Sequence, residues 1–312
     1  MLGFFGRKKR VEGLVGLSVN ESRIALAHVS RRRDELRLER CLHQPVNRAN
    51  PAREALARLV DEQGLGKAAC CYVLSPGDYN IYLVEAPQVE PDEVSSAVRW
   101  KIKDLLDIPV EDAMIDVFPV PEGAFQGRNK MLYAVAASRS RLEQVVATVS
   151  RSGLDLHAID IPEMALRNIS NHFLDDHNGL AFISLKQNGS TLNISREGQV
   201  YLTRRINTPV GPDVMKQNDW DMIRDRLVLE IQRSLDYAES QMGLSAVSQI
   251  MIAPRENDTE AMMNALADGL ANPVGVVDIE HEMPSAEGIS AEIKRASIIE
   301  IGAALRVDDE VR

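Results

Sequence analysis

Hydrophobic and polar positions alternate at the start of the chain and again near its middle. Residues 13–29 (GLVGLSVNESRIALAHV) and 35–44 (ELRLERCLHQ) predict three consecutive antiparallel strands with a tight turn between the first two. After residue 179, the stretch GLAFISLKQNGSTLNISREGQVYLTRRI predicts three more short strands, with turns at Asn188-Gly189 and Glu197-Gly198. The two meanders share one strand-turn-strand outline.

Helical periods and short apolar runs follow each meander. After the first, the sequence predicts a helix with Asn50 as N-cap, Pro51 at the first helical position and Gly64 just past its end. After the second, it predicts a long helix over 220–243, and then a strand, a helix and a strand up to residue 279. The two halves are similar, which predicts an α/β fold of two lobes with a cleft between them.

A segment between the halves departs from this repeat. An amphipathic helix is predicted over 90–109, followed by a hairpin, and its apolar face holds Val94, Ala97, Trp100, Ile102 and Leu105. We expect Trp100 in the core of a small inserted α+β domain. The expected limits of the domains are residues 1–12 for a basic and apolar tail, 13–85 and about 161–178 for the first lobe, 86–160 for the inserted domain, and 179–312 for the second lobe.

Composition and charge narrow the possible functions. Hydrophobic residues make up 45% and charged residues 26% of the 312 positions, as in soluble globular proteins. A net charge of −10 argues against a general nucleic-acid-binding surface. The three cysteines include no CxxC pair, which leaves a zinc site or a disulfide framework without support. Cys70 and Cys71 are expected on opposite faces of one strand.

The first ten residues, MLGFFGRKKR, combine apolar side chains with four cations. The candidate tail residues are Phe4, Phe5, Arg7, Lys8, Lys9 and Arg10. Two interpretations remain open, a solvated terminus and a weak anchor on a membrane surface or a partner. The segment is too short to span a bilayer and no signal-peptide core follows it, so we expect a soluble, cytoplasmic protein.

Four segments resemble, in the same order, the PilM family of type IV pilus assembly proteins. They are Leu105–Pro121, Ala158–Leu166, Glu230–Tyr237 and Ile301–Arg306. Within that family the chain is most similar to the MshI-type members of mannose-sensitive haemagglutinin (MSHA) pilus biogenesis. The resemblance implies duplicated actin-like (RNase H-like) lobes, with a small inserted α+β domain and a nucleotide cleft between the lobes.

In the actin-like superfamily the first meander turn offers backbone N–H groups to the phosphates of ATP. Such a turn needs a glycine for close approach, an aspartate to organise Mg²⁺, and in this family a lysine further on. In this chain Ser18, Asn20 and Ala25 correspond to the aspartate, the glycine and the lysine. Glu21 adds negative charge, although Asn20 can still adopt the left-handed backbone region. This turn is similar to a phosphate turn in outline but not in chemistry.

The other nucleotide elements depart from the family pattern in the same direction. In the second turn Phe182 corresponds to the metal-organising aspartate and Ser184 to the glycine, whereas Gly189 remains. A Gly-Gly pair that approaches the adenosine corresponds to Ala253 and Pro254, and Pro254 has no N–H. We therefore expect at most weak binding of ATP and Mg²⁺, no catalytic residue and no resident metal.

The long helix, in contrast, favours a nucleotide site. The long helix carries Glu230 and Arg233 at i,i+3, where similar helices touch ribose and adenine, although a salt-bridged surface that includes Arg226 explains the spacing equally well. The candidate residues of a degenerate nucleotide cleft are Ser18, Asn20, Glu21, Ser22, Ser184, Gly189, Glu230 and Arg233.

The resemblance implies a scaffold that is peripheral at the inner membrane. It would bind the N-terminal peptide of a PilN-like inner-membrane protein in a groove beside the inserted domain, with an assembly ATPase or platform protein as further partners. Two alternatives are an ATP-binding, nucleotide-switched PilM-type protein and a GspL-type scaffold of type II secretion. The GspL type is expected less, because that family carries a transmembrane helix after the domain and none follows in this sequence.

Overall fold

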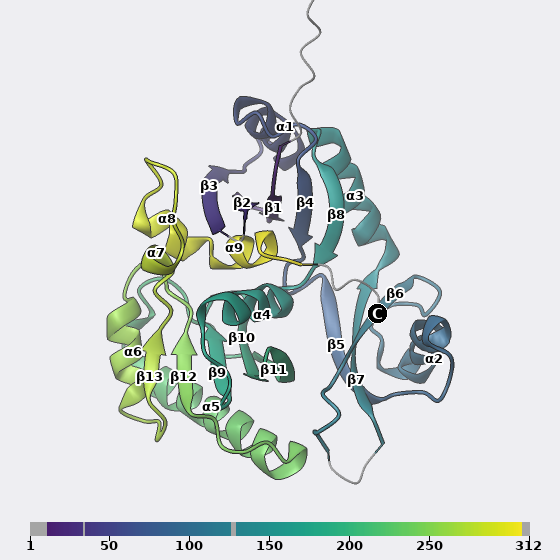
Figure 1. The fold of residues 1–312 in the computed structure, drawn as a ribbon, viewed down its shortest axis with the longest axis vertical. Helices are drawn as coiled ribbons and strands as arrows, with labels where there is room; N and C mark the ends of the chain where they lie inside the picture. Colours follow the sequence, from purple (N-terminus) through teal and green to yellow (C-terminus); the bar gives the residue numbers. More distant parts are fainter. Residues whose placement is uncertain (1–10, 34, 126–128, 308–312) are drawn as a thin grey trace, which may run out of the picture.

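Two five-stranded sheets form the two halves of the computed structural model, which describes residues 11–33, 35–125 and 129–307 (Figure 1). In the first sheet the order is β3-β2-β1-β4-β8, with β1 antiparallel to β2 and parallel to β4. Its strands are β1 (Leu14–Val19), β2 (Arg23–Arg32), β3 (Glu35–Pro45), β4 (Ala69–Val73) and β8 (Asp155–Asp160).

The second sheet repeats this order as β11-β10-β9-β12-β13. Its strands are β9 (Leu180–Ser184), β10 (Ser190–Arg196), β11 (Gln199–Ile206), β12 (Gln249–Ile252) and β13 (Val274–Val276). Between β10 and β11, Glu197 and Gly198 both have positive φ, as a two-residue hairpin turn of the predicted kind requires. The duplicated α/β architecture predicted from the sequence is confirmed.

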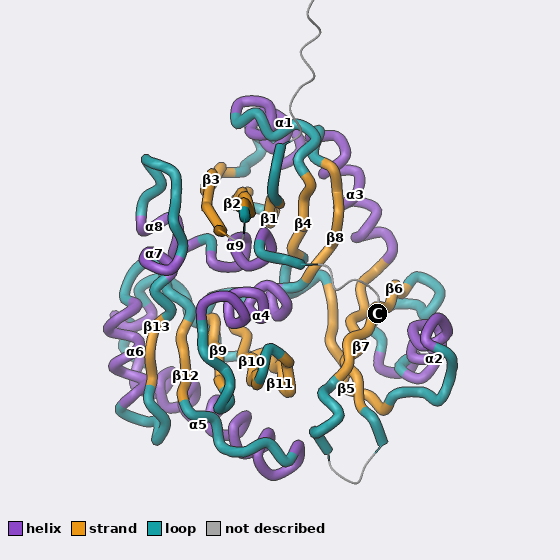
Figure 2. Tube along the Cα trace, viewed as in Figure 1, coloured by secondary structure: helices purple, strands orange, loops and turns teal. Residues whose placement is uncertain are grey.

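Helices cover both sheets and separate them (Figures 1 and 2). Helices α1 (Ala52–Glu62) and α3 (Arg139–Ser152) pack on one face of the first sheet, and α5 (Trp220–Met242) and α6 (Thr259–Ala267) on one face of the second. Helices α4 (Pro162–Phe173) and α9 (Ile298–Ala304) lie between the sheets and pack against each other. The remaining short helices are η3 (Val214–Lys216), α7 (Ile279–Glu282) and α8 (Ala291–Ala296).

A third sheet of three antiparallel strands stands beside the two lobes. Its order is β5-β7-β6, and it consists of β5 (Tyr79–Glu85), β6 (Ala113–Pro119) and β7 (Met131–Ser138). The helix α2 (Val94–Lys101), between the turns η1 (Pro91–Glu93) and η2 (Lys103–Leu105), packs on it. The elements expected together in 86–160 therefore divide between two units. Strand β8 pairs in parallel with β4 of the first sheet, α3 packs on that sheet, and β5, which precedes residue 86, joins the third.

The expected core position of Trp100 is wrong, because 61% of this residue is exposed. The buried face of the helix follows i,i+4 spacing through Val94, Val98 and Ile102, and Val98 and Ile102 are completely buried. Trp100 lies two residues from Ile102, on the opposite side of the helix. The helix also ends at Lys101, so that Leu105 falls in η2 and is 57% exposed.

The predicted start of the first helix and the predicted placement of the two neighbouring cysteines have different outcomes. Helix α1 begins at Ala52 with Pro51 at the N-cap, and Asn50 instead donates from Nδ2 to the carbonyl oxygen of Pro45 at 2.9 Å. Cys70 and Cys71 do pack into different cores on opposite faces of β4. The candidate tail residues between Phe4 and Arg10 lie outside the described residues.

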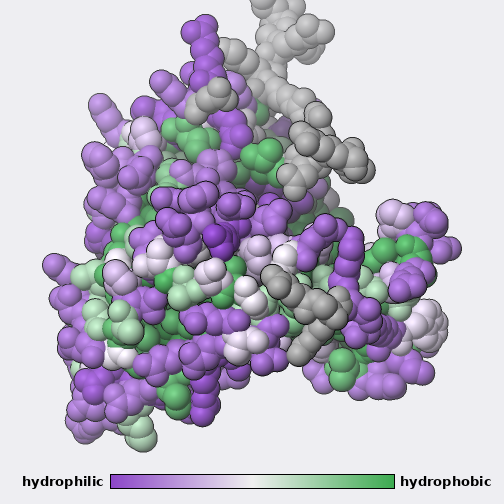
Figure 3. All heavy atoms as spheres, turned by 60° about the horizontal axis from the view of Figure 1, so that its bottom comes forward, coloured by the Kyte–Doolittle hydropathy of each residue, from purple (hydrophilic) through white to green (hydrophobic). Residues whose placement is uncertain are grey.

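None of the helices in the described part of the chain combines the length and apolar character that a membrane span requires. On the face shown in Figure 3, hydrophobic side chains gather in small groups between hydrophilic ones.

Candidate functional site

A cleft of about 990 Å³ opens between the sheets, where the turns of the two meanders approach each other. Six of the eight candidate nucleotide residues line it, namely Ser18, Asn20, Glu21, Ser22, Ser184 and Gly189. Glu230 and Arg233 on α5 are not among the lining residues. The structure therefore brings six of the eight candidate residues together at one cleft, together with lining residues that the sequence did not single out, among them Lys186 and Glu300.

The first turn uses its own backbone N–H groups. The N–H groups of Ser22 and Arg23 donate to Asn20 Oδ1 at 2.9 and 2.8 Å, and the Ser22 hydroxyl donates to the same oxygen at 3.0 Å. An asparagine side chain closes such a turn because its amide oxygen reaches the backbone two and three residues on. In this chain the side chain of Asn20 therefore already accepts hydrogen bonds from the N–H groups of the turn that a phosphate would need as donors.

The floor of the cleft carries a buried carboxylate. Ser18 on β1 donates from its hydroxyl to Glu300 Oε1 on α9, and Glu300 is only 3% exposed. Its other oxygen, Oε2, is buried and has no hydrogen-bond partner within the described residues. A carboxylate from a distant helix therefore lies beside Ser18, the residue that the sequence resemblance aligns with a metal-organising aspartate. A negative charge at this depth opposes a triphosphate.

The second turn is shaped by packing. Phe182, at the position of the expected aspartate, is completely buried in the core shared with α4 and α9. Gly189 has φ of +124°, and a Cβ built on it would lie 3.1 Å from Cβ of Pro76 in the first lobe. The turn therefore lies against the opposite lobe and needs glycine for both its conformation and its closeness.

The two remaining nucleotide elements have structural partners of their own. The guanidinium of Arg255, which follows Pro254, bonds to Asp258 and to three backbone carbonyls of the second lobe. Glu230 accepts from the Thr208 hydroxyl at 2.7 Å and pairs with Arg226 at 3.4 Å. No group of three or more His, Cys, Asp or Glu side chains in the described ranges could hold a metal ion. The side chains at these two expected nucleotide positions therefore bind to other groups of the protein itself.

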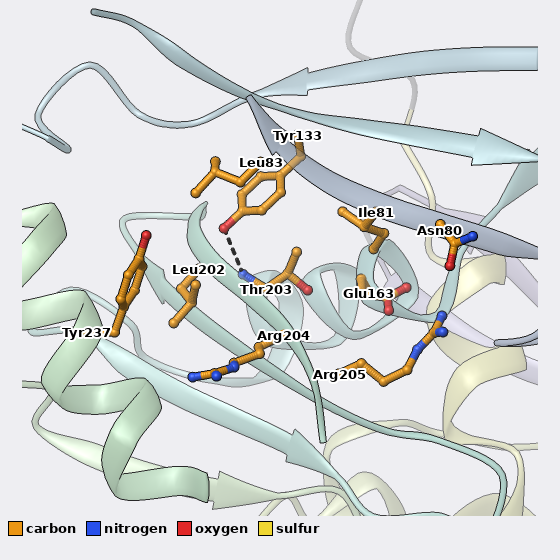
Figure 4. Close-up of a pocket in the computed structure, with 10 residues that line it drawn as sticks. All are labelled: Asn80, Ile81, Leu83, Tyr133, Glu163, Leu202, Thr203, Arg204, Arg205 and Tyr237. Atoms are coloured by element: carbon orange, nitrogen blue, oxygen red, sulfur yellow. Dashed lines mark hydrogen bonds between the residues drawn. The ribbon is translucent and has the colours of Figure 1, made fainter. Parts of the chain in front are cut away.

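A second candidate site is a groove of about 390 Å³ between the inserted sheet and the second lobe (Figure 4). Strands β5 and β7 form one wall, β11 the other, and α4 and α5 contribute Glu163 and Tyr237. The Tyr133 hydroxyl donates to the carbonyl oxygen of Tyr201 and accepts from the N–H of Thr203, both at 3.2 Å. One tyrosine therefore joins β7 to the outer edge of β11.

One end of the groove contains a buried acid. Glu163 is 1% exposed and accepts from the Tyr79 hydroxyl at 2.6 Å, and burial raises the pKa of this carboxyl group. The guanidinium carbon of Arg205 lies 5.2 Å from the centre of the Tyr79 ring, and Figure 4 shows Arg205 beside Glu163. Sequence reasoning expected a groove beside the inserted domain but assigned none of its residues. No local pattern brings residues 79, 133, 163 and 205 together.

Comparisons with known proteins identify the fold. No protein-family model matches the chain, and no curated protein sequence matches it. Among solved structures, it is similar to "PilM-PilN type IV pilus biogenesis complex", with 18% identity, coverage of 95% of this chain and 97% of the other, and a TM-score of 0.71.

Two further structures share this architecture. The cytoplasmic domain of EpsL, an inner-membrane component of the type II secretion system of Vibrio cholerae, is 11% identical over 96% of this chain and 97% of its own, with a TM-score of 0.53. A Bacteroides thetaiotaomicron protein with an actin-like ATPase fold and unknown function is 8% identical over 94% and 98%, with a TM-score of 0.52. The chain therefore has an actin-like ATPase fold.

Proposed function

We propose that this protein is an actin-like scaffold of a type IV pilus assembly complex of the MSHA type. It binds the extended N-terminal peptide of a PilN-like inner-membrane protein in the groove between β5 and β11, at the cytoplasmic face of the inner membrane. The likeness in fold to the PilM-PilN structure, over 95% of the chain, supports this proposal.

The observation that carries the proposal is the pair of strands that border the groove. Strand β5 is at the edge of the three-stranded sheet, and β11 is at the edge of the second five-stranded sheet. An extended peptide can bind such an edge through main-chain hydrogen bonds, and alternate side chains then enter adjoining pockets. The Tyr133 hydroxyl already bonds to β11 at Tyr201 and Thr203, so the edge of β5 is the better place for the peptide.

Titration with labelled N-terminal peptides of PilN-like proteins tests this function. Fluorescence anisotropy should show saturable binding, and Leu83→Arg in the groove wall should weaken it about tenfold or more, because the new charge would be desolvated by the peptide. Met222→Arg is the matched control, since Met222 is 67% exposed on α5 and does not line the groove. Absence of binding, or equal weakening by both variants, would exclude the groove.

In the proposed scaffold the cleft between the lobes does not bind ATP. The self-bonded first turn and the buried carboxylate of Glu300 support this part of the proposal. The scaffold would then transmit partner binding without a nucleotide cycle.

A second candidate is a scaffold of type II secretion, which the likeness to the EpsL cytoplasmic domain favours. Its expected partner is the N-terminal segment of a secretion-system membrane protein rather than that of a PilN-like protein. The same anisotropy experiment with both peptide sets decides between them, because the tighter ligand identifies the machine.

A further inference from the structure

Charged side chains from both lobes meet at the cleft beside the buried carboxylate of Glu300. Arg23 on β2 belongs to the first lobe, and Lys186, which follows β9, belongs to the second. His43 lies beside Arg23, with Nδ1 at 3.4 Å from a guanidinium nitrogen, and its Nε2 is 2.8 Å from the Ser297 hydroxyl. Burial lowers the pKa of His43, which keeps the ring neutral near pH 7. Arg23 and Lys186 therefore line the same cleft as Glu300, and the charge of Glu300 acts on Lys186.

Glu300 and Lys186 line the same cleft, and the charge of Glu300 acts on the ammonium group of Lys186. Oε2 of Glu300 is buried without a hydrogen-bond partner among the described residues, although Ser18 fixes Oε1. Burial lowers the pKa of the Lys186 ammonium group, and the charge of Glu300 opposes this shift. A buried carboxylate oxygen without a donor is costly in free energy, and so is a desolvated ammonium group.

We propose that Lys186 and Glu300 form a charge pair across the cleft that sets its opening in place of a nucleotide. Closure of the lobes brings Lys186 Nζ to Glu300 Oε2 and satisfies both groups. Ser18 holds the carboxylate in position, and Gly189 already lets the second turn lie close to Pro76 of the first lobe. This inference does not depend on the peptide groove, which lies between other elements.

The test is a double-mutant cycle with Lys186→Met and Glu300→Gln. Lys186→Met should lower the folding equilibrium constant about tenfold in the native background, because it leaves a buried carboxylate uncompensated, and less than about twofold in the Glu300→Gln background. Lys216→Met is the matched control, since Lys216 pairs with Asp213 at 2.7 Å on the exposed surface. Its effect should be the same in both backgrounds.

Hydrogen exchange separates a pair that controls the cleft from one with a local structural role. Lys186→Met should speed amide exchange in both turns, residues 18–23 and 186–191, and should leave β5 and β11 unchanged. Lys186→Arg, which keeps the charge, should restore slow exchange. Equal effects of Lys186→Met in the two backgrounds, or unchanged exchange in the turn of the first lobe, would overturn the proposal.

Discussion

Gly302 of α9 lies directly against the backbone of Ala165 of α4. A Cβ built on Gly302 would come within 2.2 Å of the carbonyl oxygen of Ala165, a separation that real Cβ atoms do not reach. Gly16 has the same role on the other side of α9, where a Cβ would lie 1.8 Å from the carbonyl oxygen of Glu300. These two glycines let α9 lie close to both the first sheet and α4, and so fix the distance between the lobes.

We therefore expect Gly302→Ala to lower the free energy of unfolding by about 2 kcal/mol or more, because the added methyl group meets backbone rather than a movable side chain. Urea denaturation followed by circular dichroism measures the change. Gly66→Ala is the control, since Gly66 has open space around its Cα and no positive φ. A cost below about 0.5 kcal/mol at Gly302 would show that α4 and α9 can separate freely.

Tyr133→Phe tests the link between β7 and β11. Loss of the hydroxyl leaves the buried N–H of Thr203 and the carbonyl oxygen of Tyr201 without this partner, which should cost about 1–3 kcal/mol of stability. Exchange of the Thr203 amide should accelerate. The control is Tyr82→Phe, because the Tyr82 hydroxyl donates to Leu105 in an exposed position, where water can replace it. Similar costs in both variants would contradict the assigned role.

The sequence predicted the duplicated sheets because strand alternation and hairpin turns are local signals. The same reasoning failed at Trp100, because this residue lies two positions from Ile102 and therefore on the opposite side of the helix from the buried Val98 and Ile102. It also did not decide whether Glu230 touches a nucleotide or forms a surface salt bridge. Spacing of i,i+3 identifies a helix face but not the loop that covers this face. The pairing of Ser18 with Glu300 spans 282 positions and has no local signal. Composition and spacing therefore sufficed for the fold but not for the floor of the cleft.

The helix of the inserted domain provides a direct comparison of two apolar residues. Ile102→Ala should destabilise the protein by about 2–5 kcal/mol, because Ile102 is completely buried. Trp100→Ala should change the free energy of unfolding by no more than about 0.5 kcal/mol, since most of this residue already faces solvent. Thermal unfolding of both variants shows which substitution costs more stability. A larger cost at Trp100 would mean that the side chain is covered in solution by another part of the protein or by a second copy.

Glu163→Gln should change how stability depends on pH. The folded state holds the Glu163 proton more tightly than the unfolded chain, because burial raises the pKa of this carboxyl group above its usual 4.5. The stability from this group is thus complete below pH 4.5 and is lost as pH rises through the folded pKa. The glutamine variant lacks this loss and should gain stability relative to the native protein with rising pH, measured by urea denaturation at several pH values.

Glu143→Gln, on the exposed face of α3, serves as the control and should run parallel to the native protein. Asp160, another buried acid with a raised pKa, repels Glu163 when both are ionised, so Glu163→Gln also relieves Asp160 and strengthens the same trend with rising pH. If the free energies of unfolding of the native protein and Glu163→Gln differ by the same amount from pH 4 to pH 8, the pH dependence does not come from Glu163.

Calorimetric titration with ATP up to millimolar concentration, with and without Mg²⁺, should show no binding. Asn20 already accepts hydrogen bonds from the N–H groups of Ser22 and Arg23, and the carboxylate of Glu300 lines the same cleft, where its charge would oppose that of a triphosphate. Asn20→Gly frees the turn but leaves that carboxylate in place, so this variant should not bind tightly either. Magnesium-dependent binding of ATP by the native protein at micromolar concentration would overturn the proposal that the scaffold binds no nucleotide. It would favour a nucleotide-switched protein. Binding by Asn20→Gly alone would show that the asparagine, rather than the buried charge, closes the cleft to ATP.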